Sequence, residues 1–155
     1  MSGPSYLVAG GELIRWKRRG ALGDAYSLFE NVTQPGYPGP PPHRHLGQDE
    51  TWFVMDGSFA FDVDGATIAA GPGDCVHAPR GVVHTFRNTG TDVGRLLVVV
   101  GPAGDFEAFV EETGEPTTAN LPPALDGPPS AAVIERVLAG ARRHHIDIPP
   151  PDATH

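Results

Sequence analysis

Residues 43–50 read His43-Arg44-His45-Leu46-Gly47-Gln48-Asp49-Glu50. Alternate residues of a β-strand point to the same face, so the imidazoles of His43 and His45 can converge on one ion if this segment is extended. A second segment, residues 73–84, ends in His84. Three imidazoles and the carboxylate of Glu50 suit a first-row transition metal, whereas calcium and magnesium prefer shells made of oxygen. The two segments together predict one metal site.

The spacing of these segments matches a pair of family motifs. The first motif has His-x-His, three or four residues, Glu, six residues and Gly, and the chain has Gly57 at the last of these positions. The second motif has Gly, five residues, Pro-x-Gly, two residues, His, three residues and Asn. The chain meets it at Gly73, Pro79, Gly81, His84 and Asn88. One position departs, since Tyr37 stands where the pattern has Gly, six residues before His43. On these motifs the chain resembles the cupin superfamily.

Short β-type runs separated by Gly, Pro and Asp turns extend over the first two thirds of the chain. They predict strands at residues 11–16, 25–33, 43–46, 50–55, 58–63, 67–70, 74–78, 84–88 and 95–100. This number of strands is typical of a jelly roll. The fold expected from the resemblance is all-β, the cupin double-stranded β-helix, or jelly-roll barrel, with a C-terminal arm and helix. Residues 96–100 are apolar on both faces, which predicts a strand that is covered on both sides. Because cupins are commonly dimers, we expect a homodimer in which the second subunit covers the outer face of this strand.

The composition changes after Gly104, and we expect three segments. These are a barrel domain at residues 1–112, a Pro/Gly-rich linker or arm at 113–129, and a C-terminal helix and tail at 130–155. An apolar stripe at helical spacing runs from Val133 to Ala141, with Ser130 as N-cap and Arg142-Arg143 at the C-terminal end. Packing against the barrel is favoured over a mobile lid. His144 and His145 are interpreted as solvated helix-end residues.

The 155 residues suit one domain with a sizeable core, and the formal charge of −8 disfavours nucleic acid and anionic membranes. No apolar run approaches the ~20 residues of a transmembrane helix, and the start has no basic signal region. We therefore expect a cytoplasmic protein that binds neither membranes nor nucleic acid. The single cysteine, Cys75, excludes an intramolecular disulfide.

Strand periodicity also predicts the wall of a pocket. Trp52 and Val54 share the face of Glu50, and Phe86 shares the face of His84. In residues 25–33 either Tyr26 and Leu28 or Phe29 and Ser27 complete this wall, and Tyr26 is carried forward as a substrate-binding candidate. His77 and Cys75 are left outside the ligand set. Such a wall suits a mostly apolar or aromatic substrate.

Within the superfamily the chain is most similar to small bacterial proteins related to quercetin 2,3-dioxygenase. The resemblance implies one divalent transition metal ion, which could be Fe, Mn, Ni, Co, Cu or Zn, held by His43, His45, Glu50 and His84. It implies that a small hydroxyl or enol substrate binds as its anion, that Glu50 acts as general base, and that dioxygen is the second reactant. A non-redox polyketide cyclase or isomerase is the alternative, and a non-catalytic binding protein is the third class, because the fold hosts all of them.

Overall fold

The computed structural model describes residues 3–151 and contains twelve strands and two helices in that range. The strands are β1 (Ser5–Val8), β2 (Glu12–Arg18), β3 (Ser27–Thr33), β4 (Arg44–His45), β5 (Asp49–Asp56), β6 (Phe59–Val63), β7 (Ala66–Ala70), β8 (Cys75–Ala78), β9 (His84–Asn88), β10 (Gly94–Gly101), β11 (Glu115–Thr117) and β12 (Ile146–Asp147). The helices are α1 (Asp105–Thr113) and α2 (Ala131–Arg143).

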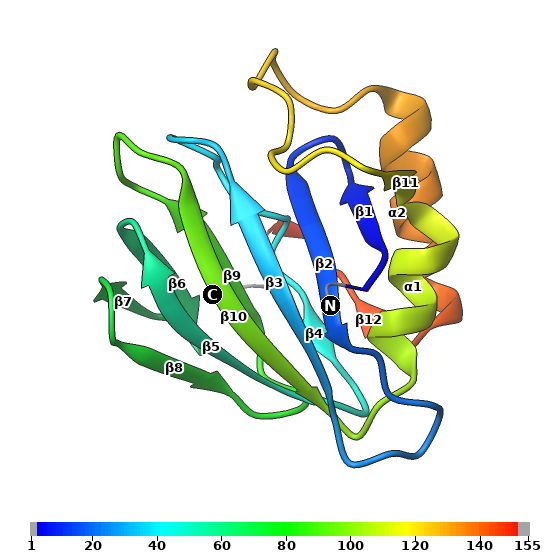
Figure 1. Ribbon diagram of the computed structural model, residues 1–155. Helices are drawn as coiled ribbons and strands as arrows, with labels where there is room; N and C mark the ends of the chain where they lie inside the picture. The colour runs from blue at the N-terminus through cyan, green and yellow to red at the C-terminus, as the bar shows by residue number, and fades with distance from the viewer. Residues whose placement is uncertain (1–2, 152–155) are drawn as a thin grey trace.

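The strands form an antiparallel jelly roll. A large sheet has the order β11-β1-β2-β3-β10-β5-β8, a second sheet has the order β7-β6-β9, and β12 pairs with β4. Figure 1 shows the two helices side by side at one edge of the molecule, next to β1, β11 and β12, with β6 and β7 at the opposite edge. The predicted all-β fold is confirmed.

Nine of these strands coincide with the nine predicted ones, with ends that differ by a residue or two. β1, β11 and β12 were not predicted. They are short, and β11 contains Pro116, so their pairing depends on the strands that they join rather than on a local pattern. β1 and β11 extend the large sheet, and β12 pairs with β4, which carries His45.

The hairpin between β6 and β7 shows why the strands turn where they do. Asp64 and Gly65 have φ values of 51° and 80° and connect the paired residues Val63 and Ala66. Two consecutive residues with positive φ define the type I′ hairpin that Asp-Gly favours. Asp64 and Gly65 therefore form the tight turn that this dipeptide favours.

β10 is an interior strand of the large sheet and pairs with both β3 and β5. Leu96, Val98 and Val100 are fully buried in the core, whereas Val99 on the other face is 37% exposed. Within one chain the outer face of residues 96–100 in β10 is thus only partly covered. The predicted homodimer, which would cover it, stays a prediction.

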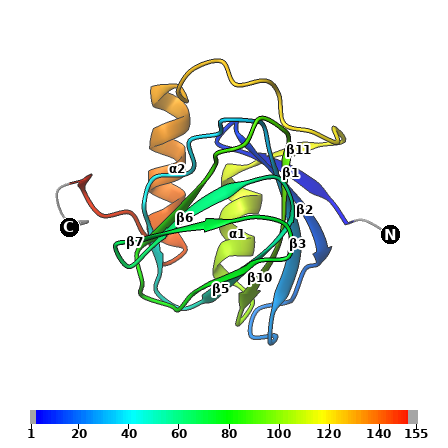
Figure 2. The ribbon, with the colours of Figure 1, turned by 90° about the vertical axis from the view of Figure 1, so that its left-hand side faces the viewer.

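Helix α2 begins after its predicted N-cap, because the Ser130 hydroxyl accepts a hydrogen bond from the Val133 amide over 3.3 Å. The helix packs on α1 and β12. The fit to α1 is close, because a Cβ added at Gly140 would lie 2.4 Å from Cγ2 of Thr113. Figure 2 shows the segment between β11 and α2 crossing one end of the sheets. Over residues 3–151, no helix has the length and apolarity needed to cross a membrane.

The two histidines that follow α2 lie near carboxylates of α1. His144 Nε2 is 3.5 Å from Glu112, and His145 Nδ1 is 3.2 Å from Asp105. In the part of the chain that the structure describes, neither belongs to a group of three or more metal-type ligands. They join α2 to α1 electrostatically.

Candidate metal centre

Three neighbouring segments bring the four predicted ligands together. His43 precedes β4, and its backbone amide and carbonyl exchange hydrogen bonds of 3.1 and 2.8 Å with those of His84 at the start of β9. His45 lies in β4 and Glu50 in β5. The His43–His84 bridge aligns the two motifs, which lie about 40 residues apart in the sequence, so that their side chains enter the same space.

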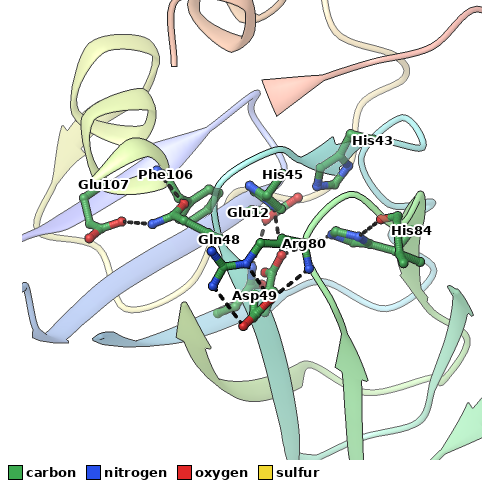
Figure 3. Close-up of polar contacts among 12 residues, drawn as sticks. Glu12, His43, His45, Gln48, Asp49, Arg80, His84, Phe106 and Glu107 are labelled. Carbon is green, nitrogen blue, oxygen red and sulfur yellow. Dashed lines mark hydrogen bonds and ion pairs between the residues drawn. The ribbon is translucent and has the colours of Figure 1, made fainter. Parts of the chain in front are cut away.

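The ligand atoms converge. One ligand atom from each of His43, His45, Glu50 and His84 lies within 4.8 Å of all the others. Glu50 Oε2 is 3.0 Å from His45 Nε2 and 3.1 Å from His84 Nε2. Figure 3 shows His43 and His45, which lie on one segment, together with His84 from a second segment, around this common space. An ion placed among these atoms would meet three nitrogens and a carboxylate oxygen.

Backbone carbonyls orient two of the rings. Nδ1 of His43 lies 2.9 Å from the Pro41 carbonyl, and Nδ1 of His84 lies 2.9 Å from the Val82 carbonyl. A carbonyl only accepts, so each Nδ1 carries the proton and donates it. In the neutral ring Nε2 then carries the free lone pair. Metal-binding imidazoles use this arrangement.

His45 is the ligand whose surroundings most favour a metal ion. Its side chain is buried, and within residues 3–151 neither ring nitrogen has a hydrogen-bond partner, since the approach to Glu50 lacks hydrogen-bond geometry. A buried polar nitrogen without a partner is costly. The Phe106 ring packs edge-on against the imidazole at 5.6 Å and holds it in place. A bound cation would satisfy the nitrogen, so the residues present fit the metal that the resemblance implies.

Charge in the site suits a cation as well. Burial, followed by the neighbouring His84 and His45 rings, lowers the pKa of His43 to about 3, so this imidazole is neutral. Burial acts to raise the pKa of Glu50, but the neighbouring His45 and His84 rings hold this pKa well below its ordinary value. Burial likewise opposes protonation of His84, yet the Glu50 carboxylate raises the pKa of this ring. The cluster therefore contains an ionised carboxylate that attracts positive charge.

A buried hydrogen-bond network anchors α1 beside the ligands. The Gln48 side chain accepts from the Phe106 amide over 3.0 Å and donates to Glu107 over 3.1 Å. Glu107 also accepts from the Ser27 hydroxyl over 2.7 Å. The network ties α1 to the start of the strand that carries Glu50, and Figure 3 shows it beside the histidines. It fixes the Phe106 ring against His45.

Three of the four candidate ligands, His43, His45 and Glu50, line a cavity of about 840 Å³, whereas His84 is not among its lining residues. Its Phe, Tyr and Trp side chains are Phe29, Tyr37, Trp52, Phe86, Phe106 and Phe109. Residues 123–129 of the arm line it too, together with Val137 of α2. The arm and helix therefore form part of the cavity wall, in addition to the packing of α2 on α1.

The predicted wall residues have different positions. Trp52 and Phe86 line the cavity, whereas Val54 is fully buried in the core and is not among the lining residues. Tyr26 does not line it: the residue is 41% exposed and its ring lies under the Arg18 guanidinium at 4.7 Å. Of the alternative set, Phe29 of β3 lines the cavity, whereas Ser27 is fully buried and donates a hydrogen bond to Glu107.

His77 and Cys75 lie on the exposed face of β8, away from the ligands. His77 Nδ1 is 2.8 Å from the Thr51 hydroxyl. His77 and Thr51 border a shallow depression on the outer surface. The omission of His77 and Cys75 from the ligand set agrees with these positions.

Sequence reasoning missed a second polar group in the cavity, formed by Glu12, Asn31 and Tyr37. A signal for it existed in two places. Glu12 shares one face of β2 with the apolar Ile14 and Trp16. Tyr37 is the residue that departs from the family motif. Neither the position of Glu12 nor the departure at Tyr37 shows from sequence alone that the two side chains contact each other.

A jelly roll with three histidines and one glutamate around a common point defines a metal-site barrel. The matching family model is described as "Cupin domain", and it covers residues 30–100. These residues form a cupin domain, as the two motifs predicted, and the chain belongs with the cupins in fold.

One curated relative is the quercetin 2,3-dioxygenase of Bacillus subtilis (strain 168). It is 30% identical over 96 residues, which are 62% of this chain and 27% of the relative. The chain therefore spans only about a quarter of the length of that protein.

Two solved structures share the fold. KdgF from Halomonas sp. has a TM-score of 0.56 at 20% identity, covering 63% of this chain and 84% of that one. The polyketide cyclase RemF from Streptomyces resistomycificus has a TM-score of 0.50 at 29% identity, covering 58% and 64%.

Proposed function

We propose that the chain is a metal-dependent enzyme that acts on a small, largely apolar or aromatic hydroxyl or enol compound, and that it is a quercetinase-like dioxygenase. The observation that carries the proposal is the three-histidine, one-glutamate cluster, of which His43, His45 and Glu50 line an aromatic cavity of about 840 Å³. A pocket of this size and lining suits a fused-ring or polyphenolic compound. The identity with the Bacillus subtilis dioxygenase supports the choice of reaction.

His43, His45, Glu50 and His84 would hold the ion. When bound, a divalent transition metal lowers the pKa of a hydroxyl group and favours its anion. Glu50 is ionised because its pKa is held low, so its carboxylate can accept a hydrogen bond or a proton from the substrate hydroxyl. Trp52, Phe86 and Phe106 exclude water and orient a planar ring. Dioxygen would be the second reactant.

A non-redox reaction is the second candidate. The polyketide cyclase RemF is 29% identical over the shared fold, and polyketides have the enol and ring groups for which this cavity is suited. In that case the same ligands would hold zinc or another divalent ion, and Glu50 would move a proton without consuming oxygen.

Elemental analysis of protein purified without chelator, followed by oxygen-uptake measurements with flavonols and polyketide-like enols, tests both candidates. A redox-active metal with substrate-dependent oxygen consumption, lost in His84→Ala and kept in the control His77→Ala, would support the dioxygenase. Zinc with conversion but no oxygen consumption would favour the cyclase. Protein without any metal would contradict both.

A further inference from the structure

The cavity contains a second buried carboxyl group. Glu12 is 8% exposed and lines the cavity from β2, together with Asn31 of β3 and Tyr37 of the segment before β4. The Tyr37 hydroxyl donates to Glu12 Oε1 over 2.8 Å, and the Asn31 amide donates to Glu12 Oε2 over 2.8 Å. We call these three residues the Glu12 group. They come from three separate segments and meet on the side chain of Glu12.

The chain makes room for this arrangement. A Cβ added at Gly11 would lie 2.4 Å from Cε2 of Tyr37, so only glycine leaves space for the ring. Backbone hydrogen bonds hold the tyrosine as well, since the Asn88 amide donates to the Tyr37 carbonyl over 3.0 Å. The residue that departs from the cupin motif is therefore built into the wall and oriented toward Glu12.

The Glu12 group has unused hydrogen-bonding capacity. A carboxylate offers about four lone-pair sites, and the two contacts described above occupy two of them. Asn31 is 3% exposed, and within residues 3–151 its Oδ1 has no hydrogen-bond partner. Buried acceptors of this kind are normally satisfied, so the group is incomplete without a donor from the cavity.

We propose that the Glu12 group binds a hydroxyl group of the substrate and selects substrates that carry one at this second position. This inference deepens the proposed function and rests on it, because it assigns a second anchoring point in the same cavity. A hydroxyl fits either protonation state of Glu12, since it donates to a carboxylate and accepts from a carboxylic acid. The substrate class is then an aromatic or polycyclic compound with two oxygen substituents, one directed to the metal ligands and one to Glu12.

The test compares two probes of nearly the same shape, 2-naphthol and 2-methylnaphthalene, by equilibrium dialysis with the as-purified full-length chain. One hydrogen bond to a buried acceptor should make 2-naphthol bind about tenfold more tightly. The ratio of the two affinities is the readout, because a general change in cavity shape would alter both together.

Glu12→Gln should reduce that ratio to within about twofold. The variant can remain folded, because the amide carbonyl still accepts from Tyr37 and the amide nitrogen can donate to the unpartnered Asn31 Oδ1. Asn31→Leu is the second variant, and it should lower the ratio by removing the free acceptor. His45→Ala is the matched control, which disrupts the metal ligands and should keep the preference.

Equal affinity of the wild type for the two probes, or no binding of either, would overturn the inference. A preference lost in His45→Ala but kept in Glu12→Gln would also overturn it, because the hydroxyl would then bind at the metal ligands. Failure of the proposed enzyme function has a different signature, namely absence of metal or turnover, and leaves the probe ratio of His45→Ala unaffected.

Discussion

Glu50 and Glu12 are two glutamates with nearly the same burial and opposite electrostatic behaviour. They are 6% and 8% exposed and line the same cavity. Around Glu50 the imidazoles of His45 and His84 outweigh burial and lower its pKa. At Glu12 burial dominates, and it raises the pKa because Asn31 and Tyr37 are neutral donors that compensate only in part, while the charge of Glu50 adds to the increase.

The difference shows that neighbours rather than burial decide the charge of a carboxyl group in this cavity. Glu50 stays ionised among imidazoles that can offer lone pairs when neutral, so its site suits a cation. The partners of Glu12 are neutral groups that donate hydrogen bonds to it, so its site suits a polar but uncharged group. One wall of the cavity therefore suits a metal ion, and the other suits a hydroxyl.

The largest expected effect removes the imidazoles from the Glu50 side. His84→Ala and His45→Ala should each lose most of the metal while the barrel stays folded, because each deletes a ligand and leaves the sheets intact. The loss of affinity should exceed the about 10–100-fold typical of outer-shell changes. Metal analysis after dialysis, with circular dichroism for the fold, measures it. Full metal content in both variants would show that these residues are not ligands.

The next effect removes a neutral donor from the Glu12 side. Tyr37→Phe leaves the ring in place and deletes the hydroxyl bound to Glu12, which should lower the free energy of unfolding by about 1–3 kcal/mol. Urea denaturation gives the value. Tyr26→Phe, at an exposed ring, is the control and should change stability by less than about 0.5 kcal/mol. Equal effects in both variants would mean that the Tyr37 hydroxyl contributes nothing special.

The pH dependence of stability sharpens the same contrast. Because the folded-state pKa of Glu12 is raised above its ordinary value of 4.5, folding favours the protonated form. The stabilising contribution is complete below that ordinary value and is lost as pH rises through the folded-state pKa. Glu12→Gln cannot lose a proton, so its stability relative to wild type should increase from about pH 5 to about pH 8. A difference that falls over this range would contradict the assigned direction.

The smallest effect is expected outside the cavity, at the residue next to Glu50. Asp49 accepts from the Arg80 backbone amide over 2.9 Å and pairs with its exposed guanidinium at 3.2 Å. Exposed ion pairs contribute little, so Arg80→Ala should keep its metal and shift the unfolding midpoint less than Tyr37→Phe does. The same urea titration and metal analysis check this. Loss of metal in Arg80→Ala would show that this ion pair supports the ligand loop.

Much of the site could be predicted because its signals are local. His43, His45, Glu50 and His84 stand at motif spacings, and strand periodicity placed Trp52 on the face of Glu50. Tyr26 shows the limit of this reasoning. Periodicity states which residues share a face but not which face is inside, and the start of β3 at Ser27 put Phe29 rather than Tyr26 in the cavity.

The sequence by itself determined the cupin fold, the four metal-type ligands and an aromatic wall, because these depend on spacings within single strands and turns. Only the tertiary structure decided that Glu12, Asn31 and Tyr37 meet, that the arm lines the cavity, and that two similar glutamates differ in proton affinity. The physical reason is that the pKa and the hydrogen bonds of a buried side chain depend on neighbours from distant segments, and the register of β2 with β3 places those neighbours.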